Sequence, residues 1–233
     1  GPAPPLRVEK KIARIGTIGI TGPLAEAGIG SWHGYIDYWR HVNETGGIDG
    51  IKVDYLYADN AGNAATNVLI YERYITHDPK PLAMWNGDTG PTEALKERAA
   101  RANVILVTSG GSDPCWNPPA STFSIGTGGY GNTFAAWVDW VLEYDWKGPG
   151  RPKVGIFTVE VPSGRAVLEH GPAYAEEKGM DYLGVEFIPY FATDVSAQVA
   201  KMKALGADYL WWGITANGAV TVSKETRRIG WDV

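Results

Sequence analysis

The chain has 233 residues, with 21 Lys and Arg against 26 Asp and Glu, which gives a formal net charge of −5 at pH 7 with neutral histidines. Binding to nucleic acid needs a clustered basic surface, and no run of Lys or Arg is longer than two residues, so we expect no nucleic-acid partner. No stretch approaches the roughly 18 uninterrupted apolar residues of a membrane-spanning helix, so we expect no membrane insertion.

Glycine, proline and aromatic residues are frequent. The 30 glycines and 15 prolines predict many tight turns between the elements. The ten Trp and twelve Tyr suit a wall that grips a small ligand, although most single rings are expected to lie in the core. The only cysteine, Cys115, excludes an intrachain disulfide and an all-cysteine metal site. It leaves the cellular compartment open.

From residue 12, short apolar runs alternate with stretches of helical period, which is typical of a parallel sheet with crossover helices. The predicted order of the first half is strand 12–20, helix 30–43, strand 51–57, helix 64–77, strand 82–85, helix 90–101 and strand 104–107. The second half continues with strand 121–125, helix 132–144, strand 153–158, helix 164–178, strand 185–188, helix 195–205, strand 208–212 and helix 216–228.

Two consecutive prolines make residues 116–120 the best candidate for a crossing between two lobes. We therefore predict an α/β fold of two Rossmann-like lobes with parallel sheets flanked by helices, the first over residues 12–120 and the second over 121–233. Residues 229–233 look like the lead from a helix into a further strand, so we expect more of the second lobe to follow.

Motifs for catalysis are weak or missing. Residues 126–131 match G-x-G-x-x-G between a predicted strand and a predicted helix. The partner acid of a dinucleotide site should lie on the following strand about 20 residues on, but here a long predicted helix intervenes and the next strand ends near Thr158. The four histidines form no metal-binding pair, and neither a G-x-S-x-G elbow nor a phosphate-binding P-loop occurs. We therefore expect no enzyme activity, no catalytic residue, no metal and no cofactor, with a nucleotide-dependent enzyme using residues 126–131 as the remote alternative.

Polar and small residues follow two neighbouring predicted strands, in segments 86–90 and 108–114. Ligands of open α/β sheets bind outside the carboxyl ends of the strands, where helix N-termini present unpaired backbone N–H groups. Hydroxyls and amides beside glycines can hold a carboxylate without any catalytic group. These two segments are therefore our candidate ligand site.

The order of several short motifs resembles the type I periplasmic solute-binding proteins of the Leu/Ile/Val-binding family, which serve ABC importers. The motifs are Ile20-Thr21-Gly22-Pro23-Leu24-Ala25, Asn43-Glu44-Thr45-Gly46-Gly47-Ile48-Asp49-Gly50, Ala58-Asp59-Asn60, the segment 108–114, Asp194-Val195-Ser196 and Asp208-Tyr209-Leu210-Trp211-Trp212-Gly213. The resemblance implies a periplasmic or extracellular protein whose signal peptide is not in this chain. It also implies a small-molecule ligand, an amino acid or related small carboxylate held between the lobes, and an ABC transporter permease as partner.

The resemblance also assigns residues. Thr89 falls where a hydroxyl binds the ligand carboxylate, Gly110 where a carbonyl accepts from the ammonium, and Ser112 where a hydroxyl and an amide complete the head-group site. Three small residues fall where the leucine binders carry large aromatic side chains, which implies a wider pocket. The full set of expected ligand-binding residues is Thr89, Gly110, Ser112, Ser163, Thr215, Ala27, Asp88 and Gly111. A ligand-sensing domain of the same fold, in a regulator or a receptor, remains the main alternative.

Overall fold

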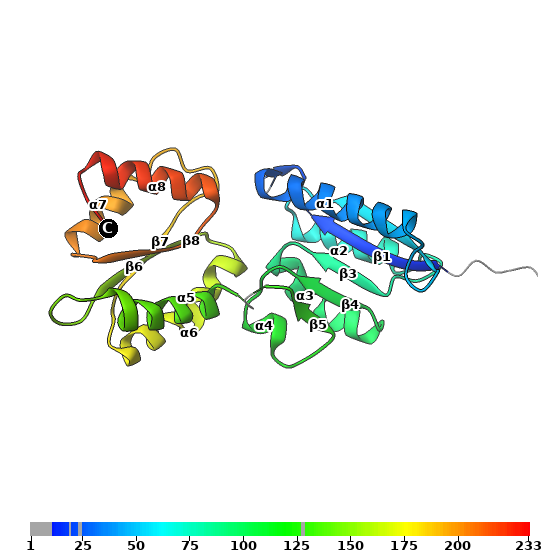
Figure 1. Cartoon of the computed structure of the whole chain (residues 1–233), viewed down its shortest axis with the longest axis horizontal. Helices are drawn as coiled ribbons and strands as arrows, with labels where there is room; N and C mark the ends of the chain where they lie inside the picture. The colour runs from blue at the N-terminus through cyan, green and yellow to red at the C-terminus, as the bar shows by residue number, and fades with distance from the viewer. Residues whose placement is uncertain (1–10, 19, 23–24, 127–128) are drawn as a thin grey trace, which may run out of the picture. The chain divides into compact units, whose positions relative to one another are not determined.

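The computed structural model describes residues 11–18, 20–22, 25–126 and 129–233 (Figure 1). Its contacts divide the chain into two compact units. Unit 1 comprises Gly1–Gly87, Ala94–Val107 and Ala120–Phe123, and unit 2 comprises Asp88–Glu93, Thr108–Pro119 and Ser124–Val233. The segments that follow the third and fourth strands therefore group with the second unit.

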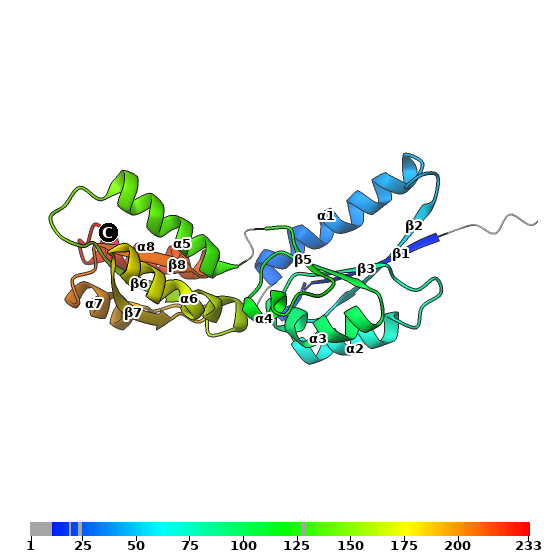
Figure 2. The ribbon, with the colours of Figure 1, turned by 90° about the horizontal axis from the view of Figure 1, so that it is seen from below.

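The first sheet has five strands in the order β2-β1-β3-β4-β5. They are β1 (Lys11–Ile18), β2 (Lys52–Asp59), β3 (Ala83–Asn86), β4 (Ile105–Thr108) and β5 (Thr122–Ser124), and β1 pairs in parallel with both β2 and β3. Figure 2 shows α1 (Ala25–Glu44) on one face of this sheet and α2 (Ala64–Tyr74) and α3 (Thr89–Arg101) on the other. Apolar side chains of α2, α3 and the strands, among them Tyr71, Met84, Leu95 and Leu106, form its core.

The second sheet has three parallel strands in the order β7-β6-β8, with β6 at Lys153–Thr158, β7 at Asp181–Phe187 and β8 at Tyr209–Gly213. Two helices, α5 (Tyr130–Trp140) and α6 (Pro162–Lys178), cover one face, and α7 (Ser196–Ala204) and α8 (Ala216–Arg228) cover the other (Figure 1). A π-helical turn, Val141–Asp145, extends α5.

Each face of this second sheet has its own core. Successive residues of a strand point to opposite faces, so Ile156 packs with Phe134 and Val167 under α5 and α6, while Phe157 packs with Val199 and Val222 under α7 and α8. The prediction of an α/β fold with parallel sheets flanked by helices is confirmed. Among the residues that the structure describes, no helix combines the length and the apolar character needed to cross a membrane.

Several predicted boundaries were wrong. Helix α1 begins at Ala25 and not at residue 30, and a short helix, α4 (Asp113–Trp116), was not predicted. Strand β7 begins at Asp181 and not at 185, because Gly184, with φ of 123°, lies at a register shift that breaks the alternation of apolar residues.

The strand predicted at 121–125 was expected to open the second lobe, and that placement was wrong. It is β5, at the edge of the first sheet. The Leu106 amide donates to the Ser121 carbonyl, and the Ile125 amide donates to the Thr108 carbonyl, so these residues pair with β4. The division into lobes at residues 120 and 121 otherwise stays a prediction.

Candidate functional site

The candidate site lies in unit 2, which contains every expected ligand-binding residue except Ala27. Ala27 belongs to α1, and its side chain lies outside the described part of the structure. The expected ligand-binding residues in unit 2 lie at the N-terminus of α3, in the segment after β4, in the first turn of α6 and at the N-terminus of α8. These are the ends of strands and the starts of helices, where open α/β sheets bind ligands.

Thr89 is the first residue of α3 and is only 3% exposed. Its carbonyl lies 3.9 Å from the Cys115 Sγ, which donates to it. The first backbone amides of a helix carry partial positive charge, and a threonine hydroxyl beside them can donate to an anion. The start of α3 is therefore suited to accept an anionic group at the Thr89 hydroxyl.

Asp88 precedes this helix and caps its first turn. One carboxylate oxygen accepts from the Gly90 amide at 3.4 Å, and the carbonyl of Asp88 accepts from the Thr92 hydroxyl at 2.8 Å. Burial raises the pKa of the Asp88 carboxyl, and the charge of Glu93 adds to that effect, while the hydrogen bonds from backbone amides oppose it. Burial of the ionised Asp88 carboxylate beside the start of α3 is therefore unfavourable for the folded state.

The segment after β4 is ordered by its own side chains. The Thr108 hydroxyl donates to the Gly110 carbonyl at 2.7 Å, which leaves one of the two lone pairs of that oxygen for a ligand donor. A Cβ at Gly111 would lie 2.2 Å from a ring carbon of Trp116, so only glycine fits against that indole. At Gly110, in contrast, a Cβ would meet no atom within 4 Å, so the space beside its backbone is open.

Ser112 is 3% exposed, and its hydroxyl donates a very short hydrogen bond to the Glu93 carboxylate. A hydroxyl has one proton, so this bond uses the donor that the resemblance assigned to the head group of the ligand. The structure thus brings Thr89, Gly110 and Ser112 into one unit and adds Glu93, which the sequence reasoning missed. The spacing of 19 residues between Ser112 and Glu93 carried no signal of the contact.

Ser163 lies in the first turn of α6 and is partly exposed. Thr215 caps α8, where its hydroxyl oxygen accepts from the Gly218 amide at 3.4 Å and its proton is donated to the Tyr190 carbonyl at 3.3 Å. Burial, together with the charge of Asp88, raises the pKa of Tyr190 to about 12. The charge of Asp88 therefore acts on the Tyr190 hydroxyl, although the two residues are far apart in sequence.

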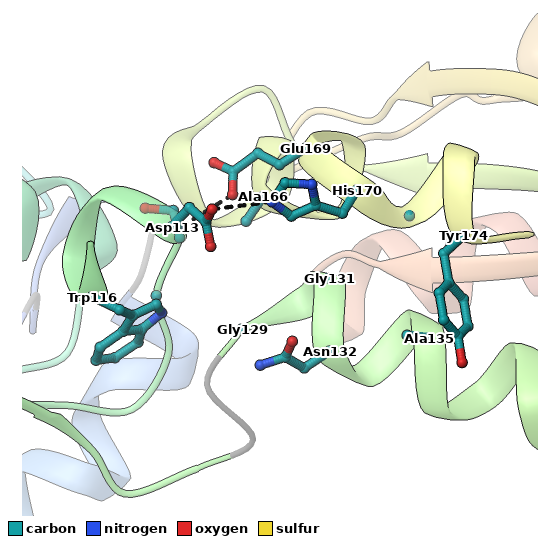
Figure 3. A pocket seen from close by; sticks show the side chains of 13 residues that line it. Asp113, Trp116, Gly129, Gly131, Asn132, Ala135, Ala166, Glu169, His170 and Tyr174 are labelled. Atoms are coloured by element: carbon teal, nitrogen blue, oxygen red, sulfur yellow. Dashed lines mark hydrogen bonds and ion pairs between the residues drawn. The ribbon is translucent and has the colours of Figure 1, made fainter. Parts of the chain in front are cut away.

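Unit 2 also contains a pocket of about 290 Å³ (Figure 3). Of the expected ligand-binding residues, Gly111 and Ser112 line it, and Thr89, Gly110, Ser163 and Thr215 do not. Its other lining residues are Asp113, Trp116, Gly129, Gly131, Asn132, Ala135, Ala166, Glu169, His170, Gly171 and Tyr174. This pocket was not predicted from the sequence.

The glycine motif at 126–131 has a packing explanation. Thr127 and Gly128 lie outside the described residues. Gly129 has φ of 156° and precedes α5, and a Cβ there would lie 2.4 Å from the Gly111 carbonyl oxygen. Close contact between two backbone segments thus accounts for the need for glycine at that position.

The profile of the periplasmic binding protein family matches residues 12–233. The chain belongs to this family. A curated relative, the "Leu/Ile/Val-binding protein homolog 1" of Brucella abortus, is 21% identical over 199 residues, which are 84% of this chain and 52% of the relative. The chain therefore spans about half the length of the curated relatives it matches.

Solved structures of the family share the fold. A branched-chain amino acid ABC transporter protein from Thermus thermophilus with bound valine superposes with a TM-score of 0.84 at 20% identity, covering 95% of this chain and 57% of that one. A fatty acid ABC transporter substrate-binding protein from Thermomonospora curvata gives a TM-score of 0.82 at 19% identity, covering 95% and 56%. The predicted resemblance to the Leu/Ile/Val-binding family is confirmed.

Proposed function

We propose that this periplasmic binding protein chain captures a small carboxylate, most specifically an amino acid, outside the cytoplasm and delivers it to the permease of an ABC importer. The proposal includes closure of two lobes on the ligand and no chemical step. The names of the relatives support the ligand class, because Leu, Ile, Val and fatty acids all carry a carboxylate.

The observation that carries this proposal is the position of Thr89, a buried hydroxyl-bearing residue that is the first residue of α3. A ligand carboxylate there would accept from the hydroxyl and lie at the positive end of the helix dipole. The Gly110 carbonyl, with its remaining lone pair, would accept from the ligand ammonium. The proposed set of ligand-binding residues is completed by Ser112, Ser163, Thr215, Ala27, Asp88 and Gly111.

The first test is a thermal-shift screen of the full chain against the twenty amino acids, a panel of aliphatic and aromatic carboxylates, NAD and ATP. A ligand present at 100 times its Kd stabilises the folded state by about 2.7 kcal/mol, which raises Tm by several degrees. A shift with an amino acid or a carboxylate supports the proposal. A shift with NAD or ATP alone would contradict it in favour of a nucleotide-dependent protein.

The second test concerns Thr89. A hydrogen bond to a charged group is worth about 1.5–3 kcal/mol, so Thr89→Ala should weaken binding of the ligand found in the screen by about 10- to 150-fold in calorimetry. Thr89→Ser keeps the hydroxyl and serves as the matched control. Equal affinity in Thr89→Ala and the parent chain would remove Thr89 from the site.

A further inference from the structure

Three side chains with metal-binding atoms meet at one edge of the pocket in unit 2. Asp113 opens α4, and Glu169 and His170 lie next to each other in α6. Their carboxylate oxygens and an imidazole nitrogen all lie within 4.8 Å of one another. Figure 3 shows the three side chains turned toward a common point.

The contacts within this triad fix its geometry. The His170 Nε2 lies 3.0 Å from the Asp113 Oδ2, and the Asp113 backbone amide donates to the Glu169 Oε2 at 3.0 Å. The His170 side chain is 75% exposed and that of Asp113 is 48% exposed, so both have freedom to adjust. Metal bonds of about 2.0–2.2 Å place ligand atoms up to about 4.4 Å apart, which small rotations of these side chains reach.

A metal site also needs room for the waters that complete the coordination of the ion, and the pocket beside Asp113, Glu169 and His170 provides it. Its volume of about 290 Å³ is several times the roughly 30 Å³ that one water occupies in the liquid. Ser112 and Asn132 also line the pocket, and their side-chain oxygens can accept hydrogen bonds from metal-bound waters.

We propose that Asp113, Glu169 and His170 bind one divalent transition-metal ion of the Zn²⁺ type. One imidazole and two carboxylates form a nitrogen and oxygen donor set that suits zinc and its neighbours better than Mg²⁺, for which oxygen ligands in strict octahedral geometry are needed. The remaining coordination positions are filled by waters in the pocket.

The ion has a structural consequence within unit 2. It ties the start of α4 to the third turn of α6, and α4 directly follows the segment that holds Gly110 and Ser112. Because a ligand that binds the folded state alone raises stability, Zn²⁺ should raise the Tm of the chain. None of the three metal ligands is a proposed ligand-binding residue, so metal binding can be measured without the transported ligand.

The test is isothermal titration calorimetry of the full chain with ZnCl₂ alone, in a buffer that does not chelate zinc. We expect about one equivalent to bind to the parent chain, and His170→Gln, Asp113→Asn and Glu169→Gln each to weaken it at least about tenfold. His41→Gln removes an exposed histidine from the end of α1 and is the matched control, expected to bind as the parent does. Circular dichroism checks that each variant folds. If one of the three ligand variants does not fold, the other two still test the site.

Two outcomes would overturn the proposal. The first is no Zn²⁺ binding up to millimolar concentration. The second is binding that His170→Gln, Asp113→Asn and Glu169→Gln all leave unchanged, which would place the metal elsewhere. Titration with MgCl₂ tests the donor set, because Mg²⁺ binding as tight as that of Zn²⁺, and insensitive to His170→Gln, would contradict a site with an imidazole ligand.

Discussion

The Ser112 hydroxyl donates a hydrogen bond to the Glu93 carboxylate, and this contact places a negative charge beside the proposed head-group site. Ser112 is buried, while Glu93 lies one helical turn after Thr89 in α3. The segments 88–93 and 108–119 contain Asp88, Glu93 and Asp113 but no Lys or Arg. The charges of this region therefore favour the ammonium of an amino acid and oppose a ligand that is only a carboxylate.

A Glu93→Gln variant tests that charge. Glutamine still accepts a hydrogen bond from Ser112 but carries no charge, so repulsion of a ligand carboxylate falls. We expect the affinity for a simple carboxylate such as isovalerate to rise about tenfold, and that for the matching amino acid, L-valine, to rise less, since its ammonium loses an attractive partner. Calorimetry with both ligands measures the two changes.

The matched control is Glu97→Gln, which removes an exposed carboxylate from the same helix. We expect it to leave both affinities unchanged. A gain for isovalerate that is equal in the two variants would show that only the net charge of the protein matters, and would contradict a specific effect of Glu93.

The order and type of most elements could be predicted from the sequence. Each strand of a buried parallel sheet is a short apolar run, and in each crossover helix apolar residues recur about every 3.6 residues. Strand β6 is an example, since its residues Ile156 and Phe157 serve two cores and both are apolar. The helix α4 was missed because four residues around Pro114 carry no periodic signal. The membership of β5 in the first sheet depends on pairing with β4, which no local pattern encodes.

The location of the candidate site could be predicted because it follows from where the strands end and the helices begin. Segments 86–90 and 108–114 could be selected on that basis. Unit 2 contains residues 88–90 of the first segment and all of the second, and their role in binding stays a prediction. The partners of their side chains could not be predicted, because they depend on which helices pack together. The pair Asp113 and His170 is separated by 57 residues, and His170 read on its own was an ordinary surface histidine.

Gly164 in the first turns of α6 is required for packing. A Cβ there would lie 2.1 Å from the Val159 carbonyl oxygen and 2.7 Å from the Thr158 hydroxyl, and both are buried. Because the nearest atom belongs to the backbone, it cannot rotate away, and we expect Gly164→Ala to lower the free energy of unfolding by roughly 3 kcal/mol. Urea unfolding followed by circular dichroism measures the loss.

Gly34 in α1 is the matched control, since a Cβ there meets no atom within 4 Å. Alanine is favoured over glycine inside a helix, so Gly34→Ala should stabilise the chain by roughly 0.5–1 kcal/mol. Equal effects of the two substitutions would contradict the steric explanation for Gly164.

Asp88 should make stability depend on pH. Its folded-state pKa is raised above the ordinary value of 3.8, chiefly by burial, so the folded chain binds this proton more tightly than the unfolded chain does. The resulting stabilisation is complete below the unfolded pKa and is lost as the pH rises through the folded pKa. Asp88→Asn stays neutral at every pH and keeps an oxygen for the Gly90 amide, so it should raise Tm at about pH 7.5 and leave Tm nearly unchanged at about pH 3.

Thermal melts of the parent chain and Asp88→Asn at the two pH values measure this effect. Asp37→Asn, which replaces an exposed carboxylate of α1, is the control and should show no comparable gain at about pH 7.5. A Tm of Asp88→Asn below that of the parent at neutral pH would mean that the helix-capping charge of Asp88 outweighs the cost of burying it.

Thr215 is expected to contribute to stability whether or not it also touches a ligand. Its side-chain oxygen accepts from the Gly218 amide in the first turn of α8, and its hydroxyl donates to the Tyr190 carbonyl. Removing an N-cap side chain costs about 1 kcal/mol, so Thr215→Ala should lower the free energy of unfolding by about that amount in the absence of ligand, while Thr215→Ser should retain most of it. Urea unfolding of the ligand-free variants separates this role from binding, because a ligand contact cannot change the stability of the free chain. Equal stability of Thr215→Ala and the parent would show that the long bonds to Gly218 and Tyr190 contribute nothing to folding.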